Sequence, residues 1–353
     1  MLGKIVTFFA SVTALFSCAA PTTPEIRTLC LRDDIGNYII KWETFPPMEG
    51  SVRIYASDVP DYFEQVSLAG LAGISEGITK YITIDNITRK YFLLNFNDQY
   101  KEIVGARAVN TDHVENFRDL GGYLTEDKKM LKWGHIFRSA NLDHISTLDK
   151  YRIDNLSVNT IIDLRTPEEI PHEPINYPHA RRINIPISAG KIKDAEERIK
   201  QGRMKKGDGV LFLQDVYLQF IEKNSEQFAL ALDMFTDKKN YPILFHCTIG
   251  KDRTGFLAAL LLVALDVPEE TVMKDYLLSN NYININQQAS YARDMDTDAQ
   301  ETITTLYSAN ELYLGVAFKK IKKEYGSIQK YLEETLNFTS KKREKLKEIM
   351  LYE

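Results

Sequence analysis

The sequence contains little cysteine or tryptophan and no excess of positive charge. Its 353 residues include 3 cysteines and 2 tryptophans, and 44 lysine and arginine residues stand against 49 aspartate and glutamate residues. So few cysteines cannot build a disulfide framework, and their spacing matches no zinc site. A net charge of −5 argues against a general nucleic-acid-binding surface. Beyond the N-terminus no apolar stretch is long enough to cross a bilayer, and the length leaves room for two domains.

The N-terminus has the pattern of a bacterial export signal. Lys4 supplies a positive charge, and an apolar stretch from Ile5 to Phe16 follows, which is too short to span a bilayer comfortably. The segment Leu15-Phe-Ser-Cys18 resembles a lipobox. We therefore expect residues 1–18 to form a lipoprotein signal segment in which Cys18 carries the lipid, so that the protein is anchored in the cell envelope, outside the cytoplasm. The alternative is a buried N-terminal helix or strand with an incidental cysteine.

Residues 19–107 have the composition of short β-strands separated by turns. Ser51-Val-Arg-Ile-Tyr-Ala56 alternates apolar and polar residues, which is typical of a half-buried strand. Clusters such as Asp33-Asp-Ile-Gly36 and Pro46-Pro47 mark turns. The spacing predicts a small all-β sandwich, similar in composition to immunoglobulin- or fibronectin-type modules. No catalytic cluster stands out in it, so we expect a spacer or a docking module for a protein partner.

From residue 108 to residue 353 the pattern changes to strands that alternate with helices. Thr160 to Leu164 and Tyr241 to Phe245 have the composition of buried strands, and Phe256 to Leu265 has that of a buried helix. Alternation of this kind predicts an α/β domain with a central, largely parallel sheet flanked by helices.

This second domain carries a cysteine and an arginine six positions apart, Cys247 and Arg253, where a predicted strand leads into a predicted helix. Backbone N–H groups and the positive end of the helix dipole attract an anion at such a turn. Arg253 adds two parallel donors for two phosphoryl oxygens, a geometry that lysine cannot copy. The remaining predicted phosphate ligands are the residues between them, Thr248, Ile249, Gly250 and Lys251.

The arrangement suits thiol chemistry on a phosphate monoester. The positive field of the loop would hold Cys247 as a thiolate, the form that attacks phosphorus. A cysteinyl-phosphate would form and water would hydrolyse it, while Thr254 donates a hydrogen bond to the departing sulfur. His246 is expected to orient the loop rather than to transfer protons. The alternative is an ordinary strand-to-helix turn with a buried cysteine and solvated charges.

The loop sequence His246-Cys-Thr-Ile-Gly-Lys-Asp-Arg-Thr-Gly255 resembles the signature of the bacterial tyrosine-phosphatase family that includes atypical dual- and triple-specificity members. Other segments resemble further motifs of that family: Asn116–Gly122, Phe137–Leu142, Ile162–Arg165 and Asp275–Asn280. The resemblance implies a phosphatase-type α/β fold and a two-step thiol mechanism that needs no metal ion or cofactor. It also implies activity on phosphotyrosine, with phosphoserine, phosphothreonine and phosphoinositides as further substrates.

The chain lacks the Trp-Pro-Asp segment in which many tyrosine phosphatases carry the general acid. The preferred candidate is Asp252, since the resemblance implies that loops containing Lys-Asp-Arg use this aspartate to protonate the leaving group. The second candidate is Asp163, which ends a predicted strand at the sheet edge where sites form. Asp163 could instead form a structural salt bridge with Arg138 or Arg165.

Three further charged side chains are candidates for the phosphate pocket. Arg118 and Asp119 could line it, or they could form an ion pair that ties their segment to the sheet. The side chain of Lys251 could attract a highly charged head group, or it could be a surface lysine with a general electrostatic role.

The sequence therefore leaves three functions open. The first is an exported phosphatase with tyrosine-phosphatase chemistry. The second is a phosphoinositide or inositol-phosphate phosphatase that uses the same loop, although the sequence predicts no strongly basic pocket. The third is a non-catalytic module that binds a phosphorylated ligand, and the intact pair of Cys247 and Arg253 argues against it.

Overall fold

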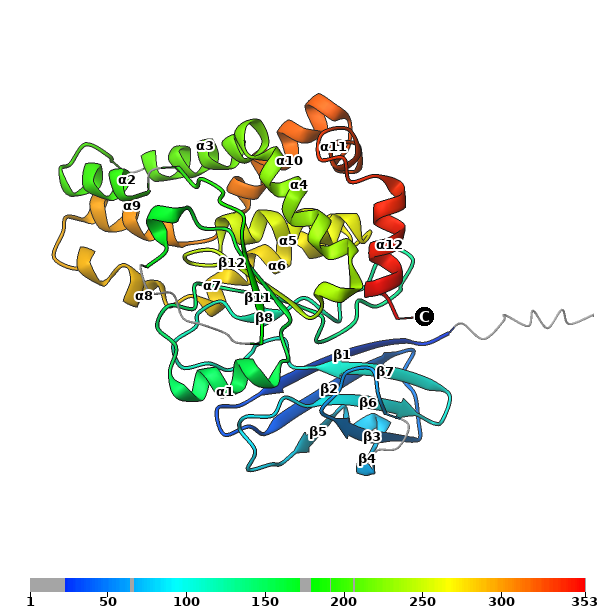
Figure 1. The fold of residues 1–353 in the computed structure, drawn as a ribbon. Coiled ribbons are helices and arrows are strands. Elements are labelled where there is room, and N and C mark those ends of the chain that lie inside the picture. Colours follow the sequence, from blue (N-terminus) through cyan, green and yellow to red (C-terminus); the bar gives the residue numbers. More distant parts are fainter. Residues whose placement is uncertain (1–22, 64–66, 172–178, 191, 206, 353) are drawn as a thin grey trace, which may run out of the picture.

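The computed structural model describes residues 23–63, 67–171, 179–190, 192–205 and 207–352. Two units are visible in Figure 1, a β-rich N-terminal unit and, above it, a larger unit of helices around a sheet. The predicted signal segment, with Cys18, lies outside the described residues. Within the described ranges, no helix combines the length and the apolar character that a bilayer crossing requires.

The N-terminal unit consists of two antiparallel sheets. Its strands are β1 (Glu25–Arg32), β2 (Tyr38–Phe45), β3 (Ser51–Ser57), β4 (Leu68–Gly73), β5 (Ile78–Tyr81), β6 (Tyr91–Phe96) and β7 (Tyr100–Gly105), with a 3₁₀ helix, η1 (Ile74–Glu76), between β4 and β5. One sheet has the order β1-β2-β5 and the other has the order β4-β3-β6-β7.

One apolar cluster contains side chains from both sheets. Tyr38, Ile40 and Trp42 of β2 and Val52 and Ile54 of β3 are buried in it, whereas the residues between them are at least partly exposed. This alternation is what a strand with one face on a core requires. The likeness to immunoglobulin- or fibronectin-type modules and the boundary after residue 107 stay predictions.

The larger unit is built on a five-stranded sheet. Its strands are β8 (Arg118–Asp119), β9 (Ile136–Ser139), β10 (Thr160–Asp163), β11 (Arg181–Asn184) and β12 (Ile243–His246). The order is β11-β10-β12-β9-β8, in which the first four strands are parallel and β8 is antiparallel to β9. All residues of β12 are buried, as expected of a central parallel strand that is covered on both faces. The predicted mixed α/β fold is therefore confirmed.

Helices surround this sheet (Figure 1). They are α1 (Thr147–Asn155), α2 (Ile192–Lys200), α3 (Asp208–Lys223), α4 (Ser225–Asp233), α5 (Asp252–Ala264), α6 (Glu269–Leu277), α7 (Ser279–Tyr282), α8 (Ile285–Gln288), α9 (Thr297–Tyr307), α10 (Glu311–Tyr325), α11 (Ile328–Glu334) and α12 (Ser340–Met350). Short 3₁₀ helices are η2 (Pro167–Glu169), η3 (Met234–Thr236), η4 (Lys238–Asn240) and η5 (Ser290–Ala292).

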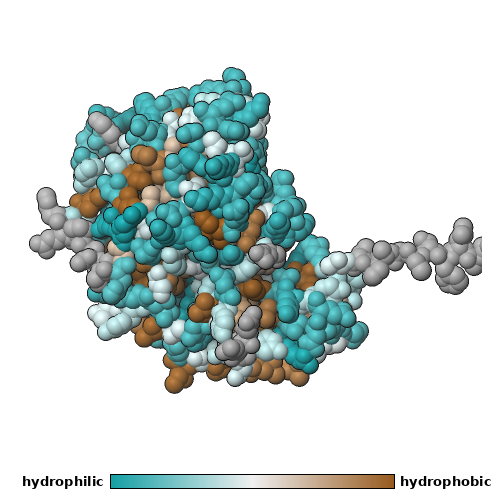
Figure 2. Space-filling model, turned by 45° about the vertical axis from the view of Figure 1, so that its right-hand side comes forward, coloured by the Kyte–Doolittle hydropathy of each residue, from teal (hydrophilic) through white to brown (hydrophobic). Residues whose placement is uncertain are grey.

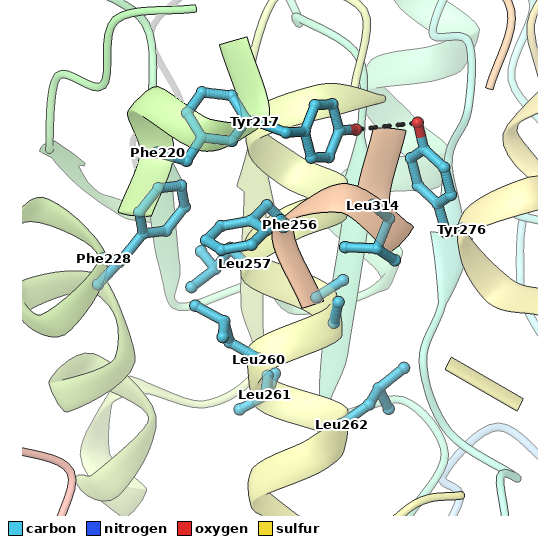
Figure 3. Packing of buried hydrophobic residues seen from close by; sticks show 14 of the residues in the cluster. Tyr217, Phe220, Phe228, Phe256, Leu257, Leu260, Leu261, Leu262, Tyr276 and Leu314 are labelled. Atoms are coloured by element: carbon cyan, nitrogen blue, oxygen red, sulfur yellow. Dashed lines mark hydrogen bonds between the residues drawn. The ribbon is translucent and has the colours of Figure 1, made fainter. Parts of the chain in front are cut away.

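Helix α5 forms the centre of the larger core. Every residue from Arg253 to Ala264 is buried, and a helix that is largely apolar on all sides belongs in the interior. Figure 3 shows Phe256 of α5 clustered with Phe228 of α4 and Leu314 of α10, and the ring centroids of Phe228 and Phe256 are 4.8 Å apart. Because the loop after β12 leads directly into α5, this packing fixes the position of the loop.

A buried ion pair joins the two units. Arg89, which precedes β6, donates to a carboxylate oxygen of Asp119 on β8 at 2.9 Å, and the two side chains are 5% and 0% exposed. Asp119 also accepts hydrogen bonds from the backbone N–H groups of Gly121 and Gly134, both at 2.7 Å. The N-terminal unit therefore supports strand β8 directly.

Candidate active site

The loop between β12 and α5 turns sharply at Gly250. This glycine has a φ of +72°, in the left-handed region that favours glycine. A Cβ atom there would lie 2.4 Å from the carbonyl oxygen of Ser139 and 2.6 Å from the backbone nitrogen of Ala140. Glycine therefore allows the loop to pack against the end of β9, where a side chain would clash.

A buried network holds the carbonyl group of Gly250. Asn116 donates to this oxygen at 2.7 Å and Arg138 donates to it at 2.8 Å. Arg138 also donates to Asp275 at 2.7 Å, and Arg118 donates to the other carboxylate oxygen of Asp275 at 3.1 Å. Burial would raise the pKa of Asp275, but the charges of Arg118 and Arg138 hold it well below its ordinary value. Asp275 is therefore ionised, and it fixes both arginines beneath the loop.

Cys247 lies at the start of the loop, 3% exposed. Its Sγ accepts a hydrogen bond from the backbone N–H of Gly250 at 3.3 Å, and the N-terminus of α5 adds a positive dipole end nearby. Both contacts favour negative charge on the sulfur. Burial lowers the pKa of His246 to about 4, so its imidazole is neutral at neutral pH. Its Nδ1 lies 3.3 Å from the carbonyl oxygen of Cys247, which suits the orienting role expected from the sequence.

The guanidinium group of Arg253 is held by Glu169, at the end of η2. Two nitrogens of Arg253 donate to the two carboxylate oxygens of Glu169 at 2.6 and 2.7 Å. Thr248 donates its hydroxyl to the same carboxylate at 2.6 Å. Burial would raise the pKa of Glu169, but the hydrogen bonds and charge of Arg253 lower it to about 2. This bidentate pair fixes the arginine while the carboxylate stays ionised.

Several donors of the loop have no partner in the described part of the chain. They are the backbone N–H groups of Thr248, Ile249 and Lys251, the Nε of Arg253 and the hydroxyl of Thr254. The last two atoms are buried, and a buried donor without a partner costs free energy. A phosphoryl group bound at the loop would give such donors their acceptors.

Comparison with known proteins decides the family. The tyrosine phosphatase family matches residues 109–352, which is more than half of the chain. The chain belongs to the tyrosine phosphatase family. The resemblance inferred from the loop sequence is therefore confirmed at the level of the family, and this phosphatase is an enzyme of that family.

Curated relatives are similar to this phosphatase over more than half of its length. A "Putative tyrosine-protein phosphatase" of Cupriavidus necator is 30% identical over 238 residues, which cover 66% of this chain and 86% of the relative. The triple specificity protein phosphatase PtpB of Mycobacterium tuberculosis is 26% identical over 253 residues, covering 62% and 90%. The core catalytic domain of the PP-IP phosphatase SIW14 from S. cerevisiae aligns with a TM-score of 0.25 and 16% identity, covering 53% of this chain and 88% of that one.

Arg118 and Asp119 are placed differently from the predicted phosphate ligands. Both side chains are fully buried, and their charges are paired with Asp275 and Arg89. Arg118 also donates to the side chain of Asn116, which holds Gly250. Their assignment to the phosphate pocket is therefore corrected, because neither side chain forms a hydrogen bond with the loop among the described residues. Both have structural roles, but each is paired with a distant residue and not with the other.

The side chain of Lys251 also requires a correction. Its ammonium group is fully buried and donates to the carbonyl oxygens of Leu306 and Ser308 at 2.6 and 2.9 Å. Burial lowers its pKa below the ordinary value. The lysine therefore anchors the loop to the end of α9, and only its backbone N–H is free to meet a phosphate.

Asp252 begins α5 beside the loop, with 13% of its side chain exposed. Tyr217 of α3 donates to its carboxylate at 3.2 Å, and Lys251 lies 3.5 Å from it. Figure 3 shows the hydroxyl of Tyr217 also bonded to that of Tyr276, at 2.9 Å. These contacts position the carboxylate of Asp252 next to the catalytic loop.

Asp163, the second candidate acid, is buried beside two arginines and His246. Arg165 and Arg182 donate to one of its oxygens at 2.9 and 2.6 Å, and His246 lies 3.7 Å from the same oxygen. Burial would raise the pKa of Asp163, but these neighbours lower it well below its ordinary value. A carboxyl group that stays ionised is poorly suited to deliver a proton, and Asp163 forms the salt bridge with Arg165 that the sequence offered as the alternative.

Glu169 is the residue that the sequence analysis missed. It lies four positions after the Ile162–Arg165 motif, in the segment Thr166-Pro-Glu-Glu169. A threonine followed three residues later by glutamate is the pattern of a capping box, and Glu169 indeed accepts from the backbone N–H of Thr166 at 2.9 Å.

The described ranges contain no group of three or more His, Cys, Asp or Glu residues arranged to hold a metal ion.

Replacing Glu169 with glutamine should lower kcat/KM for an aryl phosphate by about tenfold or more, because an amide cannot accept both N–H groups of Arg253. Steady-state kinetics with 4-nitrophenyl phosphate would measure the loss. Glu168→Gln, at the exposed neighbouring position, is the matched control. The pKa of Glu169 is lowered to about 2 in the folded protein. The stability that its ionised carboxylate contributes to the folded state is therefore complete above the ordinary carboxyl pKa and is lost as the pH falls towards 2. A gain in activity would show instead that this carboxylate competes with phosphate.

Proposed function

We propose that this phosphatase hydrolyses phosphotyrosine in proteins, with phosphoserine and phosphothreonine as further substrates. The observation that carries the proposal is the set of unpartnered donors that follows Cys247. Free backbone N–H groups, the Nε of Arg253 and a helix N-terminus are what a phosphate dianion requires, and the sulfur lies among them.

In the proposed reaction the thiolate of Cys247 attacks phosphorus in line with the leaving oxygen. The bond between phosphorus and the tyrosine oxygen breaks, and a general acid protonates that oxygen. Water then attacks the cysteinyl-phosphate, the sulfur–phosphorus bond breaks, and inorganic phosphate leaves. The carboxylate that acted as the acid takes the proton from this water. The hydroxyl of Thr254 has no partner among the described residues, and in the proposed reaction it donates to the sulfur as it departs.

Asp252 is the proposed general acid. It is the carboxyl group in the loop itself, it is partly exposed, and Tyr217 holds it beside the nucleophile. The carboxylate of Glu169 is paired with Arg253, and that of Asp163 is paired with Arg165 and Arg182. Of these three carboxyl groups, Asp252 is the one that has no arginine partner.

Proteins are favoured over inositol phosphates as substrates because of Lys251. A free lysine in the loop would have supported a highly charged head group, but the ammonium of Lys251 is buried against backbone carbonyls. A non-catalytic binding role is disfavoured because Cys247, Arg253 and the groups that hold them are all present.

For the N-terminal part we propose a lipid anchor at Cys18 and a location in the cell envelope. The support is the signal-like sequence that ends in Leu15-Phe-Ser-Cys18. Large apolar side chains are also exposed on the N-terminal unit, including Leu29, Leu31, Ile82 and Ile84, and Figure 2 shows apolar patches on its lower edge. Such surfaces often mark contacts with a partner or a membrane, so we propose that this unit also docks a protein partner.

Cys247→Ser should lower the turnover of every phosphate ester by at least about 10⁴-fold, because serine is a far weaker nucleophile than a thiolate at neutral pH. A panel of phosphotyrosine peptide, phosphoserine peptide, phosphoinositides and inositol hexakisphosphate, assayed with chelator present, would measure it. The wild type should prefer the phosphotyrosine peptide. Activity that survives Cys247→Ser, or that disappears with chelator, would refute the mechanism.

Asp252→Asn should lower kcat for a phosphotyrosine peptide by about 100-fold but kcat for 4-nitrophenyl phosphate far less, because nitrophenolate leaves without protonation. Asp215→Asn, at an exposed position of α3, is a suitable control. Equal losses on the two substrates would argue against Asp252 as the acid.

Cys18→Ala should abolish incorporation of labelled palmitate and release the protein from the membrane fraction, since the proposed acyl chain is attached to this thiol. Cys30→Ala is the control, because Cys30 is buried in the N-terminal core. Labelling that persists in Cys18→Ala would exclude the proposed anchor.

A further inference from the structure

A cleft of about 730 Å³ opens beside the catalytic loop, and both units of the protein line it. Its lining extends from Thr248, in the loop, to Asp34, in the turn between β1 and β2. The cleft is joined to the catalytic loop through Asn141. The backbone N–H of Asn141 donates to the carbonyl oxygen of Thr248 at 3.1 Å, and its side chain donates to the same oxygen at 2.8 Å. A chain that lies in the cleft is therefore next to a phosphate group held by the loop.

The charges in the cleft favour a cationic ligand. Arg152 is the only lysine or arginine in the described lining, and it is already bonded to Asp112 at 3.0 Å and to the carbonyl oxygen of Asn86 at 3.2 Å. Asp34 is exposed and forms no hydrogen bond or ion pair with the described residues. Glu115 is half-buried and accepts only neutral N–H groups. Asp34 and Glu115 therefore lack a cationic partner among the described residues. Their negative charges would repel a polyanion in the cleft and attract a positively charged group of a ligand.

Carboxamide side chains supply much of the remaining lining. Besides Asn116 and Asn141, which bond to the loop, they belong to Asn110, Asn281, Asn284, Gln287 and Gln288. A carboxamide both donates and accepts hydrogen bonds, as the peptide group does. A lining of amides and carboxylates therefore matches a polypeptide, whereas an inositol phosphate would require several free cations.

We propose that this cleft binds the polypeptide that flanks the phosphorylated residue, and that a lysine or arginine of that polypeptide lies near Asp34 and Glu115. The proposal rests on the phosphatase activity proposed above and adds a substrate preference to it. The N-terminal unit takes part in substrate selection through Asp34, in addition to its support of strand β8.

The test uses two phosphotyrosine peptides that differ only in their flanking residues, lysine in one and glutamate in the other, with 4-nitrophenyl phosphate as a substrate without flanks. The wild type should have a kcat/KM about fivefold higher for the lysine peptide, and the preference should shrink in high salt because Asp34 is exposed to solvent. Asp34→Lys should remove most of this preference, mainly through KM, and leave 4-nitrophenyl phosphate hydrolysis unchanged. Glu49→Lys, an equal charge reversal in the turn between β2 and β3 and outside the cleft, should leave the preference intact.

Equal rates for the two peptides in the wild type would overturn the proposal. So would an equal effect of Glu49→Lys, or faster hydrolysis of phosphoinositide vesicles than of either peptide. If 4-nitrophenyl phosphate is hydrolysed through Cys247 but no flanking preference appears, the cleft assignment alone fails. If 4-nitrophenyl phosphate is not hydrolysed, or is hydrolysed equally by Cys247→Ser, the proposed function fails as well.

Discussion

The shape of the catalytic loop depends on one buried carboxylate, that of Asp275. It fixes Arg138, which holds the carbonyl group of Gly250, and it fixes Arg118, which steadies the neighbouring support, Asn116. Removing one partner of a buried charge pair typically costs about 3–5 kcal/mol, because the other charge is left unpaired. Since Arg118, Arg138 and Asp275 come from β8, β9 and α6, the loop conformation is tied to the fold of the whole larger unit.

Among the described basic side chains around Cys247, only Arg253 is placed to bind phosphate. Arg253 is oriented by Glu169, Lys251 is buried against the end of α9, and His246 is neutral. Attraction for the phosphoryl group therefore comes from oriented backbone N–H groups and one guanidinium group. Oriented donors of this kind act on an anion without having to reorganise when it binds. A free lysine would instead attract any polyanion that reached the loop.

The sequence was sufficient to predict the α/β fold and the strand-loop-helix order at Cys247, because these depend on local patterns. It could not predict the contacts of long charged side chains. Arg118 and Lys251 have long, flexible side chains. Their partners, Asp275 and the carbonyl groups at the end of α9, are distant in the sequence. Glu169 was missed for the same reason, since its local role as a helix cap conceals its contact with Arg253.

The ion pair between Arg89 and Asp119 has a consequence for how this protein could have changed during evolution. The family match begins at residue 109, so Arg89 lies outside it, whereas Asp119 lies within it, beside the arginine that supports the loop. The two segments can no longer vary independently, because loss of the N-terminal unit would leave a buried carboxylate without its cation. Recombination that exchanged this unit for another would have to supply an equivalent arginine or replace the aspartate at the same time.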